Sequence, residues 1–245
     1  MSQDPKVGMY IYGINPADGD LYEVRVLGGT FEGPLKVGSG WAGMRHIFSG
    51  GNQIIYAITA DGKLLWYRHI AQPALAHGWG GAFELGAAWG DVRLVCAAGD
   101  GVIFAVFNNG EFKRYVHSGW RTGDNTWVNW NPHSLAGGWH HIKKIFAWNT
   151  GNLYSISDDG NLYHYRVTDR FEAGPIKVGE GWGGFDDVFA ANGKIFARTA
   201  DKVYIYGIND DGTTGNMDVV PNQAQSLARW FGCYTSSFAW FPNGW

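Results

Sequence analysis

Charge and cysteine are both scarce in this 245-residue chain. Charged residues make up 17% of it, and the formal net charge is −3. No run or stripe of lysine and arginine appears, so the cationic surface that nucleic acid binding requires is not predicted. No apolar stretch approaches the roughly 18 residues of a membrane-spanning helix, so no membrane span is predicted.

The two cysteines, Cys96 and Cys233, are too few for a disulfide framework. We interpret both as small buried hydrophobic residues. The first six residues are polar and lack the apolar segment of a secretory leader. We therefore expect a cytoplasmic location, leaderless release or a mature secreted form, and the localisation stays open.

Aromatic residues and glycine are abundant. Aromatic residues account for 16% of the chain, with 13 tryptophans, and there are 37 glycines. Short strands joined by tight turns, with large side chains packed between sheets, have this composition. Helical bundles and disordered chains do not.

A glycine-rich loop that ends in tryptophan and precedes an apolar strand recurs along the chain. Its first four copies end at Trp41, Trp89, Trp139 and Trp182, and a degenerate fifth copy ends at Trp230. The intervals between these tryptophans are 48, 50, 43 and 48 residues. A second marker alternates with the loop: two short strands joined by Asp-Gly or Asn-Gly in four of five copies, the strongest short-range signal for a β-hairpin.

These markers predict an all-β fold, a five-bladed β-propeller of four-stranded antiparallel sheets. Units of 40–50 residues with four short strands cannot bury both faces alone, and a ring of them can. We expect an N-terminal tail over 1–7 and one propeller domain over 8–245, with repeats of approximately 8–51, 52–99, 100–149, 150–192 and 193–245. The C-terminal segment Phe238-Ala239-Trp240 resembles Phe146-Ala147-Trp148, so the N- and C-terminal strands are predicted to close the ring in one sheet.

The repeated loops and hairpins resemble the tachylectin-2 family of five-bladed propeller lectins. The resemblance covers residues from about 7 to 245. It rests on Val37-Gly38-Ser39-Gly40-Trp41, on Val178-Gly179-Glu180-Gly181-Trp182 and on hairpins such as the one that begins at Leu153-Tyr154. It implies binding of N-acetylated hexosamines between blades, by the Gly-Trp loop and polar groups from a nearby loop. The family's Asp-Asn-Trp pattern has a counterpart only at Asp124-Asn125-Thr126-Trp127, the second loop has Ala88 and the fifth has Arg229. Five equal sites are therefore not expected, and the first and fourth copies match best.

The loop residues suit a sugar because tryptophan offers an apolar ring and an N–H donor, while glycines let peptide groups approach hydroxyls closely. The alternative is that the tryptophans only pack between neighbouring blades and contact no ligand. Tyr-Arg pairs on the hairpins could add donors, or could instead cover an outer face. The predicted sugar-binding residues are Gly38, Gly40, Trp41, Gly86, Ala88, Trp89, Gly137, Gly138, Trp139, Gly179, Gly181, Trp182, Tyr67, Arg68, Tyr165 and Arg166.

Catalytic and metal chemistry are not predicted. Asp158-Asp159 and Asp186-Asp187 are adjacent on the chain and would point to opposite faces of a strand, as would His140-His141. The run Asn209-Asp210-Asp211-Gly212 lacks the later acidic ligand of a calcium loop. No cofactor, metal site or enzymatic activity is expected.

Three functions remain open at this point. The first is a multivalent lectin for glycans that bear N-acetylated hexosamines. The second is a propeller that binds another protein, and the third is an enzyme or a targeting module detached from one. A homo-oligomer is possible in each case.

Overall fold

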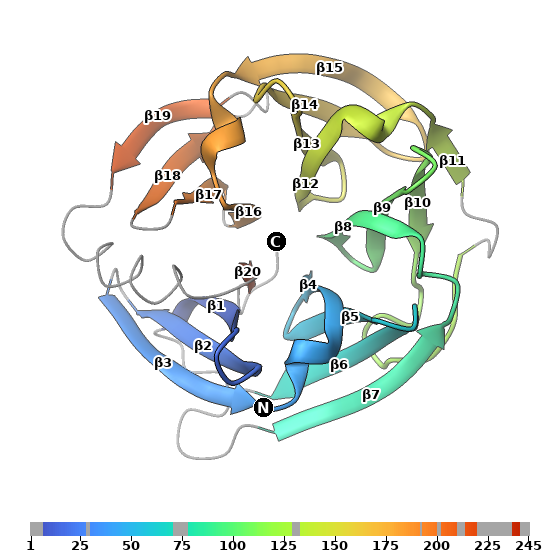
Figure 1. Ribbon diagram of the computed structural model, residues 1–245, viewed down its shortest axis with the longest axis vertical. Coiled ribbons are helices and arrows are strands. Elements are labelled where there is room, and N and C mark those ends of the chain that lie inside the picture. Colours follow the sequence, from blue (N-terminus) through green and yellow to red (C-terminus); the bar gives the residue numbers. More distant parts are fainter. Residues whose placement is uncertain are drawn as a thin grey trace.

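Five antiparallel sheets of four strands each form a ring in the computed structural model (Figure 1). The structure describes residues 7–27, 30–70, 78–128, 133–191, 193–199, 202–209, 214–219 and 237–240. The fifth Gly-Trp loop around Trp230, and Cys233, lie outside these residues. We call the sheets blades 1 to 5 in the order in which the chain enters them. The predicted five-bladed propeller is confirmed.

The strands are five to nine residues long in most positions. Blade 1 contains β20 (Ser237–Trp240), β1 (Val7–Asn15), β2 (Asp20–Leu27) and β3 (Thr30–Gly38). Blade 2 contains β4 (Met44–Gly51), β5 (Ile54–Thr59), β6 (Leu64–Ile70) and β7 (Gly78–Gly86). Blade 3 contains β8 (Val92–Gly99), β9 (Val102–Phe107), β10 (Phe112–Val116) and β11 (His133–Ala136). Blade 4 contains β12 (Ile142–Asn149), β13 (Asn152–Ser157), β14 (Leu162–Val167) and β15 (Phe171–Gly179). Blade 5 contains β16 (Asp187–Ala191), β17 (Lys194–Arg198), β18 (Val203–Ile208) and β19 (Thr214–Val219).

The second strand of a blade is buried on both faces because each face meets a neighbouring blade. Strand β5 shows this plainly, with every residue from Ile54 to Ile58 at most 1% exposed. Ile55 and Ala57 pack with blade 1, and the alternate residues Ile54, Tyr56 and Ile58 pack with blade 3. Side chains alternate along a strand, so one apolar run supplies two separate contact faces.

Each contact between adjacent blades, which we call a seam, has its own hydrophobic core. Five clusters of buried residues occupy the seams between blades 1 and 2, 2 and 3, 3 and 4, 4 and 5, and 5 and 1. The innermost strands β4, β8, β12, β16 and β20 adjoin one another around the centre of the ring (Figure 1).

Strand β20 closes the ring by pairing with β1. The two strands are antiparallel, with Tyr10 opposite Trp240 and Gly13 opposite Ser237. The predicted closure by N- and C-terminal strands is therefore confirmed. Every blade consequently takes its innermost strand from the segment that follows a Gly-Trp loop, and in blade 1 that strand comes from the far end of the chain.

No helix among the described residues is both long enough and apolar enough to cross a bilayer.

Candidate functional site

The Gly-Trp loops connect one blade to the next. In three copies the glycine before tryptophan adopts the left-handed conformation, with φ of 78° at Gly40, 80° at Gly138 and 78° at Gly181. The tryptophan then opens a single 3-10 turn, namely η1 (Trp41–Gly43), η2 (Trp139–His141) and η3 (Trp182–Gly184). Ala88 of the second copy is not among the residues of positive φ. Alanine avoids that conformation because of its Cβ, so the second loop has a different geometry.

A backbone hydrogen bond ties each loop to the hairpin of the preceding blade. The tryptophan N–H donates to the carbonyl of the glycine in the hairpin turn, over 2.8–3.0 Å. The donor and acceptor residues are Trp41 and Gly19, Trp89 and Gly62, Trp139 and Gly110, and Trp182 and Gly160. The two markers recognised in the sequence are therefore two halves of one repeated contact across a seam.

The four indoles are buried, with exposed fractions of 4–6%. Each packs against the tyrosine of a hairpin strand in the blade that follows the loop, with ring centres 4.6–5.3 Å apart. The tyrosines are Tyr67, Tyr115, Tyr165 and Tyr206, respectively. A further aromatic ring lies near each of the four indoles: Trp79, Trp127, Phe171 and Phe185, respectively. Aromatic rings thus pack against all four indoles, which leaves little of their faces open to a ligand.

The N–H edge of two of these indoles lies directly beside a glycine of the same loop. A Cβ added at Gly38 would lie 2.5 Å from Nε1 of Trp41, and one at Gly179 would meet Nε1 of Trp182 as closely. Among the described residues, neither indole N–H donates to a protein acceptor. Around Gly40 and Gly181 an added Cβ would meet nothing within 4 Å. Each of these loops therefore presents a donor that is unpaired within the described residues and lies next to bare backbone.

In each of the two predicted Tyr-Arg pairs the tyrosine packs against a loop tryptophan and the arginine is exposed. Tyr67 is half-buried on Trp41, and Tyr165 is buried on Trp139 with its hydroxyl 3.2 Å from Oγ of Ser155. Burial raises the pKa of both phenols, so both stay neutral donors at physiological pH. Arg68 and Arg166 follow them on the opposite face of the strand and are exposed.

The sequence comparisons decide the family. Residues 58–202, more than half of the chain, match the family described as Tachylectin.

The chain belongs to the tachylectin family.

Among curated proteins no relative matches. Solved structures with a similar outline include the hemopexin fold protein CP4 from cow pea, at 11% identity, a TM-score of 0.43 and coverage of 76% of this chain and 96% of the other. A plant albumin from Cicer arietinum showing hemagglutination has 13% identity, a TM-score of 0.43 and coverage of 75% and 96%. A plant lectin with two metal binding sites from Cicer arietinum has 13% identity, a TM-score of 0.45 and coverage of 76% and 95%. Family membership supports a carbohydrate-binding, non-enzymatic role for this tachylectin-family protein.

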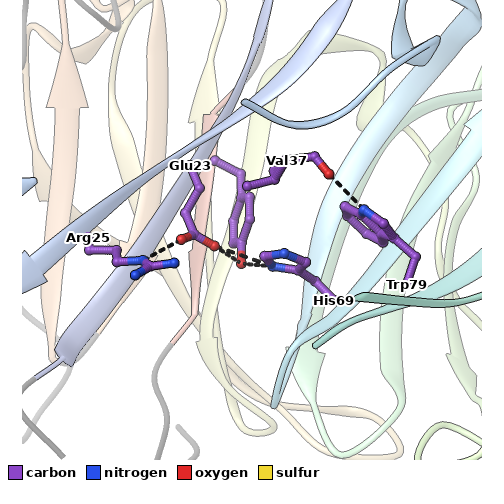
Figure 2. A network of polar contacts seen from close by, with 6 residues as sticks. Glu23, Arg25, Val37, His69 and Trp79 are labelled. Carbon is purple, nitrogen blue, oxygen red and sulfur yellow. Dashed lines mark hydrogen bonds and ion pairs between the residues drawn. The ribbon is translucent and has the colours of Figure 1, made fainter. Parts of the chain in front are cut away.

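The seam between blades 1 and 2 contains a buried charged network that the sequence did not suggest (Figure 2). Glu23 and His69 are both fully buried. The hydroxyl of Tyr12 lies 3.0 Å from Oε2 of Glu23 and 2.7 Å from Nδ1 of His69. Arg25 donates from Nε to Oε1 of Glu23 at 2.7 Å, and the His69 ring packs 4.7 Å from Trp79. Each buried charge has partners, as burial in a low dielectric requires.

The next seam has a neutral version of the same contact. Tyr56 on β5 lies 2.9 Å from Nδ1 of His117, and Nε2 of His117 lies 2.8 Å from the carbonyl of Asp124. At the same strand positions in the seam between blades 3 and 4, the residues are Phe104 and Val167, in one apolar cluster. In these three seams tyrosine is matched with histidine and phenylalanine with valine, whereas in the seam between blades 4 and 5 the residues at these positions are Tyr154 and Ile208. The Tyr-His contact is therefore a feature of two seams, and the sequence reveals it only after the repeats are placed in register.

The described residues contain no group of three or more His, Cys, Asp or Glu side chains that could hold a metal ion. The adjacent pairs singled out in the sequence have structural contacts. Nδ1 of His141 donates to the carbonyl of Gly138 at 3.0 Å, and Asp159 caps the hairpin turn by accepting from the N–H of Asn161. Of the run 209–212, residues 210–212 lie outside the described residues.

Proposed function

We propose that this protein is a multivalent lectin that binds N-acetylated hexosamines, such as N-acetylglucosamine and N-acetylgalactosamine, at the Gly-Trp loops between blades. One observation carries the proposal: in two loops an indole N–H that has no acceptor among the described residues lies beside glycine backbone. An unpaired donor next to accessible peptide groups suits a ligand rich in hydroxyls and amides.

The proposed contacts differ from simple stacking on tryptophan. Because the indole faces are covered, the sugar would accept a hydrogen bond from the indole edge and meet the peptide groups of Gly38 and Gly40. Tyr67 would hold the indole in place. Arg68 is exposed on the opposite face of β6 from Tyr67, so it is not part of the proposed loop contacts.

The copies are proposed to bind unequally. The loops at Trp41 and Trp182 share both the left-handed glycine and the indole edge beside a glycine. The loop at Trp139 has the left-handed Gly138 but open space at Gly137, and the loop at Trp89 has Ala88. Two strong sites on a rigid ring would raise avidity for a surface that carries many copies of the sugar.

Calorimetric titration with chitotetraose tests the proposal. We expect binding that free N-acetylglucosamine inhibits and glucose does not, with about two strong sites per chain on the geometry above. The double variant Gly38→Ala/Gly179→Ala should lose these sites, because each new Cβ displaces an indole edge. The control is Gly43→Ala/Gly184→Ala, where a Cβ meets nothing within 4 Å.

Circular dichroism must show both double variants folded. Unchanged stoichiometry in folded Gly38→Ala/Gly179→Ala would refute the loop site. Absence of any N-acetylglucosamine-sensitive binding or haemagglutination by the unmodified protein would refute the lectin itself and favour a protein-binding propeller.

A further inference from the structure

One end of the seam between blades 2 and 3 lacks the carboxylate found at the equivalent place in blade 1. In blade 1, Glu23 lies opposite Tyr12 and neutralises Arg25 two residues later. In blade 2, Trp66 lies opposite Tyr56, and Arg68 takes the place of Arg25. Arg68 is exposed, and within the described part of the chain it pairs with no carboxylate.

A loop of blade 3 brings a second arginine to the same place. The indole Nε1 of Trp66 donates to the carbonyl of Trp120 at 2.8 Å, and Arg68 Nη1 lies 3.5 Å from the carbonyl of Arg121. The guanidinium carbon of Arg121 lies 4.8 Å from the ring centre of Trp120. Arg121 is exposed and has no carboxylate partner among the described side chains. The acidic residue of this loop, Asp124, accepts from Oγ1 of Thr122 at 2.6 Å.

An exposed aromatic ring lies between the two blades at this point. Phe83 on β7 is 48% exposed, and its inner face stacks on Trp66 with ring centres 5.5 Å apart and an interplanar angle of 12°. Gly123 packs against both rings, and any Cβ there would clash with them. The stack therefore holds the loop that carries Arg121, while the outer face of Phe83 remains accessible. We call Arg68, Phe83 and Arg121 the basic patch.

We propose that the basic patch binds an acidic saccharide, through a carboxylate or sulfate held by the two arginines and the apolar face of a sugar ring on Phe83. The proposal rests on the carbohydrate-binding role above and adds a class of sugar to it. Guanidinium groups bind these anions by charge-assisted hydrogen bonds, and an aromatic ring covers sugar C–H groups.

The basic patch is separate from the Gly-Trp loops. Leu64 pairs with Gly86, where the second loop begins, and Arg68 lies four residues further along β6. At about 3.3 Å per residue this places Arg68 roughly 13 Å from that loop. The two kinds of site can therefore be tested independently.

The test is calorimetric titration with tetragalacturonate, which carries carboxylates and no acetamide. We expect binding that weakens with salt, that is absent for the uncharged methyl ester, and that falls about tenfold or more in Arg68→Gln/Arg121→Gln. A sulfated galactose tetrasaccharide, titrated in parallel, distinguishes sulfate from carboxylate as the preferred anion. Binding of chitotetraose should not change in this variant.

Arg166→Gln is the matched control, because Arg166 occupies the strand position of Arg68 in blade 4 and is also exposed. Arg166→Gln should bind both acidic saccharides with the same affinity as the unmodified protein. The proposal is overturned if neither acidic saccharide binds, if Arg68→Gln/Arg121→Gln binds them normally, or if Arg166→Gln weakens them equally. Failure of chitotetraose alone would refute the N-acetylhexosamine site and leave the acidic site standing.

Discussion

Single residues at matching strand positions decide whether a seam is polar or apolar. Nε2 of His117 donates to the carbonyl of Asp124, so Nδ1 of the neutral ring accepts from the Tyr56 hydroxyl. The equivalent pair of Phe104 and Val167 needs no hydrogen bond at all. Histidine in this place therefore depends on its tyrosine, and removing either partner alone leaves a buried polar group unsatisfied.

This dependence predicts non-additive effects on stability. His117→Val should lower the free energy of unfolding by about 2 kcal/mol, because it leaves the buried Tyr56 hydroxyl without its hydrogen-bond partner. Tyr56→Phe/His117→Val, which copies the Phe104 and Val167 seam, should cost less than the two single changes added together. Urea denaturation measures all three, and strict additivity would contradict the coupling.

The same double variant should change how stability depends on pH. Burial lowers the pKa of His117 below its usual 6.5 in the folded protein. Between pH 6.5 and that lower pKa, His117 is therefore protonated to a greater extent in the unfolded chain than in the folded one. The contribution of His117 is therefore complete above pH 6.5 and is lost as the pH falls below it. Urea midpoints between pH 7.5 and 5 should fall less steeply in Tyr56→Phe/His117→Val than in the unmodified chain.

At the scale of the element, a loop and a hairpin hold each other in shape. The turn glycine Gly62 has φ of 81°, and an added Cβ would lie 2.7 Å from the N–H nitrogen of Gly90 in the next blade's loop. Gly40 has a similar φ of 78° but open space around it. Gly43 has open space and no positive φ. Gly62 therefore combines a positive φ with a close backbone contact, Gly40 has a positive φ alone, and Gly43 has neither constraint.

Alanine substitutions at these glycines should rank accordingly. Gly43→Ala should be neutral or slightly stabilising, because it removes only unfolded-state freedom. Gly40→Ala should cost about 1 kcal/mol for the left-handed conformation. Gly62→Ala adds a clash with backbone and should cost more, about 2 kcal/mol or above. Thermal and urea unfolding of the three variants check the order, and equal costs at positions 40 and 62 would show that the loop yields to the added methyl.

The ring itself was the part most accessible from the sequence. The Asp-Gly turns, the Gly-Trp loops and the likeness of Phe238-Ala239-Trp240 to Phe146-Ala147-Trp148 predicted five sheets and their closure. These signals are local, and each recurs. The contacts of the seams were not predicted, because Glu23 meets His69 only after two repeats are laid side by side. The covering of the indoles by Trp79 and Trp127 was missed for the same reason.

Closure gives the whole molecule one weak point to test. In blades 2 to 5 the innermost strand comes first along the chain, whereas in blade 1 it is β20, which comes from the C-terminal end. Strand β20 pairs with β1 and adjoins both β4 and β16. A chain that ends at residue 236 lacks it, which opens the seams on both sides of blade 1 and exposes the edge of β1. Since every other seam depends on neighbours in the ring, we expect the truncated chain to lose its cooperative thermal transition and its near-ultraviolet tryptophan dichroism.

A synthetic peptide of residues 237–245 should restore both signals by pairing with β1, and a scrambled peptide of the same composition should not. A truncated chain that melts like the full one would mean that four closed blades and an incomplete first one are sufficient.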